Sequence, residues 1–279
     1  MRTVLIPVDF SDTTENLLKY AADFCVDTDV ERVILLKCHY VSSYEQLLPS
    51  ADFVQLSADS IASEKRDLVE KLRAAAKLLQ KKCKNCVEIQ TVFSDLSLVR
   101  AIHEQIANKQ PNLVMIGSDK TSGESKNRSG EQIVAIAKTS SIPVMIIPSN
   151  VQYQKIAKAV VPCDFAATAR LGALKGFHDR QRWLHPQLMV LNVDPKQKHV
   201  SNDEQVTEGL SDILKGYDYK VYYSDEKDTV KGILGFARKH DVQLIIALPG
   251  KYSFFYNLTH RSITHALALN AIRPVLILK

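Results

Sequence analysis

The sequence contains one pattern twice, and this duplication limits the fold more than any other feature does. Residues 4–10 and 159–165 each consist of an apolar run, a proline, one further residue and Asp-Phe, with an offset of 155 residues between Asp9 and Asp164. Two further pairs of segments share an offset of 131 residues: 112–117 with 243–248, and 143–147 with 274–278. Because the three matches are collinear, we expect two similar domains, residues 1–149 and 155–279, the second shorter and more degenerate.

Each copy alternates apolar runs with amphipathic segments. In the first copy, unbroken apolar runs predict buried strands, and apolar residues at helical spacing predict the helices between them. The expected strands are 4–8, 32–40, 87–93, 113–117 and 144–147, and the expected helices are 11–25, 61–79, 98–106 and 129–138. When strands alternate with helices in this way, each helix connects two strands as a crossover, and the strands therefore pair in parallel. The predicted fold class is α/β, with two tandem open five-stranded parallel sheets, helices on both faces of each, and a polar linker at 149–154.

Composition and charge exclude several classes of protein. Hydrophobic residues make up 46% and charged residues 24%, which is typical of a globular protein with a full core. The net charge of +5 is too small to indicate a nucleic-acid partner. The apolar runs fall far short of the ~20 residues that span a bilayer, and the first residues lack the features of a signal peptide. We expect a cytoplasmic protein with reduced cysteines and neither a membrane nor a nucleic-acid partner.

Two carboxylates mark the first candidate site. Asp9 and Asp164 follow the first predicted strand of each copy. In sheets of this kind, ligands bind beyond the carboxyl ends of the strands, where the strand order reverses. A carboxylate at this place accepts hydrogen bonds from a base or a sugar. The alternative is that each aspartate forms a turn or caps the following helix.

The connection after the fourth strand is the second candidate site. Residues 117–131 are rich in Gly and Ser, carry several basic residues, and lead into a helix N-terminus whose free backbone donors attract anions. These features suit a bound phosphate, although the carboxylate of Glu131 in the first helical turn would repel it. The alternative is a solvated loop that binds no ligand. The corresponding residues 249–262 hold one glycine and four aromatic residues. We expect this cluster to dock on the other half or on a second chain, with an anion contact from His260 and Arg261.

These segments resemble the universal stress protein family, in the tandem two-domain arrangement found in Bacteroidetes. The resemblance rests on Ile6-Pro7-Val8-Asp9, on the glycine-containing connection after the fourth strand, and on the closing strand that Ile142-Pro143-Val144 introduces. It implies an adenine nucleotide alpha hydrolase-like fold with the strand order 3-2-1-4-5 in each domain. It also implies that the two domains pair through their fifth strands within the chain, with a homodimer as a further expectation.

The family's ATP-binding members carry Gly, two residues, Gly, nine residues, then Gly followed by Ser or Thr. Gly117 and Gly130 match the first and third glycines, whereas Lys120 replaces the second and Glu131 replaces the hydroxyl. Of this motif, the second half keeps only the hydroxyl residue, Ser262. The resemblance implies that Asp9 meets the adenine and that a strand-two cysteine lines its pocket. The implied nucleotide-binding residues are Pro7, Val8, Asp9, Cys38, Gly117, Ser118, Lys120 and Gly130, with Asp164, Arg261 and Ser262 as second-domain counterparts.

Three functions stay open. The leading interpretation is a non-catalytic stress-response module that binds ATP or another adenine nucleotide in its first domain, with Mg²⁺ only when the nucleotide is bound. The alternatives are a nucleotide hydrolase or nucleotide-dependent switch, and an interaction protein that binds no nucleotide. The sequence has no Walker loop and no supported Ser-His-Asp or Cys-His pattern, so we expect no enzyme activity and no metal site. The single C-x-x-C at Cys83 and Cys86 is more typical of structural thiols than of a zinc or redox site.

Overall fold

The computed structural model describes residues 2–40, 58–84, 86–119, 128–163, 171–174, 184–193, 210–248 and 272–279. The first half contains β1 (Thr3–Pro7), α1 (Asp12–Asp27), β2 (Arg32–Cys38), α3 (Ala58–Lys82), β3 (Glu88–Ser94), α4 (Leu98–Lys109), β4 (Leu113–Ser118), α5 (Arg128–Thr139) and β5 (Val144–Pro148). The second half contains β6 (Lys158–Pro162), β7 (Gln187–Val193), β8 (Tyr219–Ser224), α8 (Thr229–Lys239), β9 (Leu244–Ala247) and β10 (Val275–Ile277). None of the helices in these ranges is long and apolar enough to cross a membrane.

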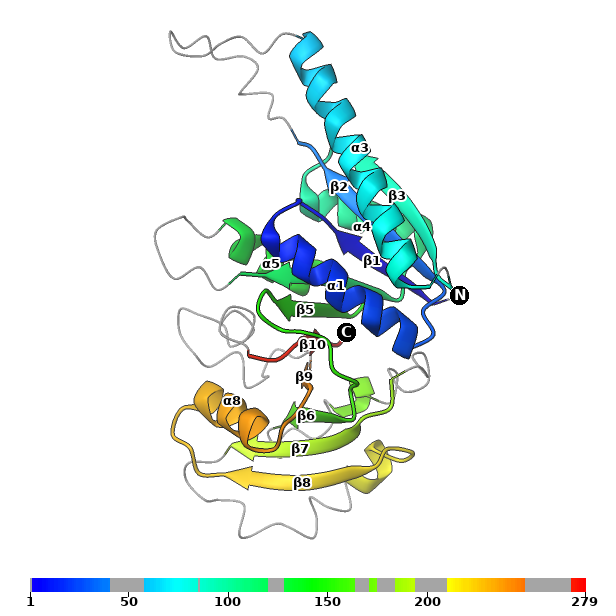
Figure 1. Cartoon of the computed structure of the whole chain (residues 1–279). Coiled ribbons are helices and arrows are strands. Elements are labelled where there is room, and N and C mark those ends of the chain that lie inside the picture. The colour runs from blue at the N-terminus through cyan, green and yellow to red at the C-terminus, as the bar shows by residue number, and fades with distance from the viewer. Residues whose placement is uncertain are drawn as a thin grey trace, which may run out of the picture.

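All of these strands belong to one sheet. Its order is β3-β2-β1-β4-β5-β10-β9-β6-β7-β8 (Figure 1). Because β6 to β10 take the places of β1 to β5, each half has the order 3-2-1-4-5. Neighbouring strands within each half run parallel. The predicted α/β class and the strand order that the resemblance implies are therefore confirmed.

The two halves meet at β5 and β10. These strands pair antiparallel, with Leu276 opposite Met145 and Val275 opposite Ile146. Both strands are buried along their whole length. An unpaired edge here would leave buried backbone N–H and C=O groups without partners, which is costly. The two sheets predicted from the sequence are consequently joined into a single ten-stranded sheet.

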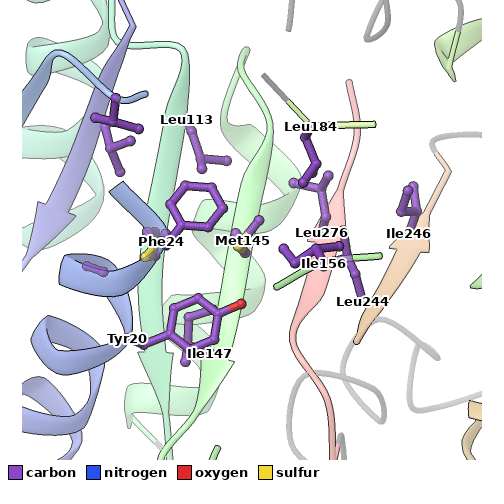
Figure 2. Close-up of a cluster of buried hydrophobic side chains, with 14 of the residues drawn as sticks. Tyr20, Phe24, Leu113, Met145, Ile147, Ile156, Leu184, Leu244, Ile246 and Leu276 are labelled. Carbon is purple, nitrogen blue, oxygen red and sulfur yellow. The ribbon is translucent and has the colours of Figure 1, made fainter. Parts of the chain in front are cut away.

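The hydrophobic core also continues across this seam, as Figure 2 shows. One face of the sheet carries a buried cluster that contains α1, the strands on both sides of the seam and residues of both halves: Tyr20, Phe24, Met145, Ile147, Leu244, Ile246 and Leu276. The opposite face carries a second cluster, to which α4, α5 and α8 contribute Ile102, Ile133 and Ile233. The two halves therefore share their core and do not fold around separate ones.

The polar connection after β5 lies against α1. Asn16 donates from Nδ2 to the carbonyl oxygen of Val151 at 3.0 Å. Tyr153 donates from its hydroxyl to Asp27 Oδ2 at 2.5 Å, and its ring packs edge-on against Tyr20 with 5.2 Å between the ring centroids. The stretch predicted as a linker is therefore packed against the first half, a contact that its polar composition did not indicate.

Candidate functional site

A cavity of about 360 Å³ lies at the carboxyl ends of β1, β2 and β4. Since β1 lies between β2 and β4 in the sheet, this is the place where the strand order reverses. Five residues that the sequence analysis named for the site line the cavity: Pro7, Val8, Asp9, Cys38 and Gly117. Other polar residues that it did not single out also line the cavity: Thr13, Thr14, Lys37, Tyr40, Ser97 and Gln132.

Asp9 is hydrogen-bonded to the start of α1. Its Oδ1 accepts from the backbone N–H of Ser11 at 3.0 Å, from Ser11 Oγ at 2.6 Å and from Thr14 Oγ1 at 2.5 Å. Ser11 is the N-cap residue of α1. Burial works against ionisation of Asp9, but the hydrogen bonds from Ser11 and Thr14 outweigh it and keep the pKa of this carboxyl below its ordinary value.

One oxygen of Asp9 therefore has the structural role that the sequence analysis gave as the alternative. No hydrogen bond among the described residues reaches the other oxygen, Oδ2. The carboxylate lines the cavity, and Asp9 stays partly exposed to solvent. A ligand in the cavity thus meets an acceptor that is held in position by α1.

Lys37 brings a positive charge to the same cavity from the end of β2. Its Nζ lies 5.0 Å from the centroid of the Phe10 ring, a distance typical of a cation–π contact. Phe10 has a φ of 68°, in the left-handed region, so the chain turns sharply directly after Asp9. Burial lowers the pKa of Lys37 below its ordinary value, and the negative charges of Asp9 and Glu64 oppose that shift.

The end of β2 also presents backbone groups to the cavity. The last paired residues of β1 and β2 are Pro7 and Leu36, and one further bond joins Val8 N to Leu36 O at 2.9 Å. Cys38 lies two residues beyond Leu36, so its backbone N–H and C=O point to the same side of the strand, past the end of β1. The cavity is lined by Cys38, in agreement with the strand-two position that the resemblance implies.

Gly117 allows α1 to approach β4 closely. A Cβ at this position would lie 2.6 Å from Thr13 Cγ2 and 3.4 Å from Thr13 O. Carbon atoms pack favourably at ~3.5–4.0 Å, so a side chain would force α1 away from the sheet. The φ of Gly117 is not in the left-handed region. The packing of α1 therefore explains this glycine without reference to a ligand.

The remaining residues predicted for the first domain lie in different places. Ser118 is buried, its carbonyl oxygen accepts from Ser149 N at 2.9 Å, and it does not line the cavity. Gly130 is buried in the first turn of α5, next to the residues of that helix that line the cavity. Glu131 is exposed and is not a cavity residue, so its carboxylate does not oppose a phosphate from within the cavity. Lys120 lies outside the described residues.

The sequence model of the universal stress protein family matches residues 1–148. The chain belongs to this family. The match covers the half of the chain that contains the cavity. A comparison with curated proteins found no match.

Two solved structures share the fold over nearly the whole chain. A universal stress protein from Archaeoglobus fulgidus is 17% identical, with 99% of this chain and 98% of that chain covered and a TM-score of 0.68. A functionally unknown protein from Pseudomonas aeruginosa is 13% identical, with 100% of this chain and 92% of that chain covered and a TM-score of 0.50. A universal stress protein in complex with cAMP is 15% identical over 53% of this chain and 98% of that chain, with a TM-score of 0.34. The first two cover nearly the whole chain, so they extend the likeness in fold to both halves.

The second half of this universal stress protein differs at the equivalent strand end. Asn192 takes the place of Lys37, one residue past the last paired residues of the first two strands of that half. It is buried, and its Nδ2 donates to the carbonyl oxygen of Cys163 at 3.2 Å. A neutral amide thus replaces the ammonium group. The predicted counterparts Asp164, Arg261 and Ser262, and the aromatic cluster at 252–258, lie outside the described residues.

The C-x-x-C pair at the end of α3 is divided between the core and the surface. Cys83 is completely buried, and burial raises the pKa of its thiol to about 11, whereas Cys86 is exposed. A thiol with a raised pKa is a poor nucleophile and a poor metal ligand. In the described ranges, no group of three or more His, Cys, Asp or Glu side chains is placed to hold a metal ion. These positions favour the interpretation as structural thiols.

Proposed function

We propose that this universal stress protein binds a nucleotide, ATP or a related one, in the Asp9 cavity and does no chemistry on it. The observation that carries the proposal is the cavity itself. It lies at the point of strand-order reversal and is lined by Asp9, Cys38 and Gly117, three residues that the family resemblance assigns to the nucleotide. Asp9 supports the proposal further, because α1 holds its carboxylate in place and Oδ2 has no partner among the described residues.

The size of the cavity suits part of a nucleotide. A volume of about 360 Å³ is at the lower end of the ~300–1,000 Å³ range of small-molecule sites. Apolar side chains of Leu17, Leu98 and Ile133 line it beside the polar groups, as a flat base requires. We place the base and the sugar inside. The phosphates would then lie towards the first turn of α5, whose backbone N–H groups attract anions.

The role proposed for the bound nucleotide is regulatory rather than catalytic. Hydrolysis requires a group that positions the water and a metal that neutralises charge on the phosphates. We assign neither role to a side chain of the cavity, and Mg²⁺ would enter only with the phosphates. Among the described residues, no observation favours the hydrolase alternative.

The test is a titration of the purified full chain with ATP, ADP and AMP, with and without Mg²⁺, followed by calorimetry and by phosphate release. We expect saturable binding without turnover. Ser97→Trp should fill the cavity and weaken binding more than tenfold, because Ser97 lines it and makes no capping hydrogen bond that would be lost. Leu96→Trp is the matched control, since Leu96 is exposed and outside the cavity.

Each outcome separates one of the alternatives. Absence of binding by the wild-type chain at millimolar nucleotide would favour the interaction protein. Binding that Ser97→Trp leaves unchanged would place the nucleotide elsewhere. Steady release of phosphate, abolished by Ser97→Trp, would establish the hydrolase.

A further inference from the structure

Tyr40 is the most exposed large hydrophobic side chain in the described part of the chain, at 60%. Single exposed side chains of this kind are ordinary on protein surfaces. Val26, Leu78 and Leu96 are also exposed and do not line the cavity, whereas Tyr40 does. The place of its ring at a ligand site therefore calls for an explanation that the other three do not need.

The end of β2 sets where this ring lies. The ladder between β2 and β3 continues one residue past β2, because His39 N donates to Ser94 O at 2.9 Å. Side chains along an extended strand alternate between the two faces of a sheet. Leu36 belongs to the buried cluster to which α4 and α5 contribute, and Cys38 packs against that cluster. Alternation therefore places Tyr40 on the same face of the sheet, directly after backbone that β3 holds.

The cavity has two apolar walls, one from each face of the sheet. Leu17 of α1 belongs to the cluster on one face, whereas Leu98 of α4 and Ile133 of α5 lie with the cluster on the other face. A flat base fits between two such walls, because its faces are apolar and its polar groups lie on its edge. One face of the base that we place in the cavity is therefore turned to the side on which Tyr40 lies.

The ring of Tyr40 is available to that face of the base. Within the ranges that the structure describes, the Tyr40 side chain makes neither a hydrogen bond nor a ring contact. Aromatic side chains bind bases by stacking, and any base can take part because every base has a π-face. Tyrosine has only two χ angles, so ordering its ring over a ligand costs little entropy.

We infer that Tyr40 stacks its ring on the base of the nucleotide, so that the cavity takes ligands that carry a flat aromatic ring. This inference rests on the proposed function, because it names the residue that holds the base of that same nucleotide. Leu36 and Leu191 are the last paired residues of the equivalent strands in the two halves, so Pro195 corresponds to Tyr40 in the sequence. The second half thus has no aromatic ring at this position.

The test is a calorimetric titration of the full chain and its variants with ATP and with adenosine. In Tyr40→Ala both ligands should bind at least about fivefold more weakly, the lower limit for the loss of one stacked base. Tyr40→Phe keeps the ring and should bind both within about twofold of the wild type. Leu78→Ala is the matched control, because it removes an exposed apolar side chain outside the cavity, and it should leave both affinities unchanged. Since Tyr40 is exposed, the thermal midpoint of its variants should stay at the wild-type value.

The inference and the proposed function fail in different ways. Nucleotide binding that Tyr40→Ala leaves unchanged and Ser97→Trp weakens would overturn the inference and leave the nucleotide site intact. Equal weakening by Tyr40→Phe and Tyr40→Ala would assign the effect to the hydroxyl group and overturn the stacking. Weaker binding of ATP by Tyr40→Ala, with adenosine binding unchanged, would place Tyr40 at the phosphates and overturn the inference as well. Absence of binding by the wild-type chain would overturn both.

Discussion

Replacing Gly117 with alanine tests whether this glycine serves the packing of α1 or the approach of a ligand. The new Cβ would lie 2.6 Å from Thr13 Cγ2, about 1 Å closer than carbon atoms pack favourably. Overpacking of this kind costs ~1–3 kcal/mol. Alanine in place of glycine also restricts the unfolded chain, which offsets ~0.4–1 kcal/mol of that cost. We expect the free energy of unfolding to fall by about 1–2 kcal/mol.

Urea unfolding followed by circular dichroism measures this change, and two further variants assign its cause. Gly235→Ala is the matched control, because Gly235 lies in α8 and a Cβ there meets nothing within 4 Å. That variant should be stabilised by ~0.5–1 kcal/mol. Thr13→Ser removes the methyl group that the new Cβ would meet, so Gly117→Ala combined with Thr13→Ser should recover about 1 kcal/mol relative to Gly117→Ala alone.

Two results would contradict the packing explanation of Gly117. If Gly117→Ala unfolds at the wild-type urea concentration and instead weakens nucleotide binding, the glycine serves the ligand and the packing argument is wrong. If the stability falls but Thr13→Ser restores none of it, the contact with Thr13 is not the cause.

Three further predictions concern other parts of the chain. The pKa of Asp9 is lower in the folded chain than its ordinary value of 3.8. The ionised carboxylate therefore stabilises the fold above that pH, and this stabilisation is lost as the pH falls through the folded pKa. The difference in free energy of unfolding between wild type and Asp9→Asn should shrink between pH 7 and pH 3 in urea titrations. Tyr153→Phe removes the hydrogen bond to Asp27 and should lower the free energy of unfolding by about 1 kcal/mol. An unchanged free energy of unfolding would contradict a stabilising role for this bond. Among the thiols, Cys86 is exposed and should react first with a disulfide reagent at pH 8, so faster reaction of the buried Cys83 would contradict the structure.

The sequence predicted much of the fold because its signals are local. The unbroken apolar runs and the helical spacing between them are properties of short segments, and the expected strands of the first half lie within two residues of the observed ones. The three collinear matches predicted two similar halves, and β6 to β10 repeat the order of β1 to β5. Asp9 was placed at the site because it follows a strand, whereas the family resemblance supplied Cys38 and Gly117, and all three line the cavity.

Only the tertiary structure decided which groups meet. Lys37 and Ser97 lie at the end of β2 and the start of α4, and nothing in their local sequence indicates that both line one cavity with Asp9. The packing role of Gly117 depends on how closely α1 approaches β4, and the single sheet depends on the pairing of β5 with β10. The hydrophobic periodicity of a segment indicates which of its faces is buried, whereas the distances between elements depend on how all of them pack together. For this reason the sequence alone determined the elements of this protein and their order along the chain, and the packing decided the chemistry of its cavity.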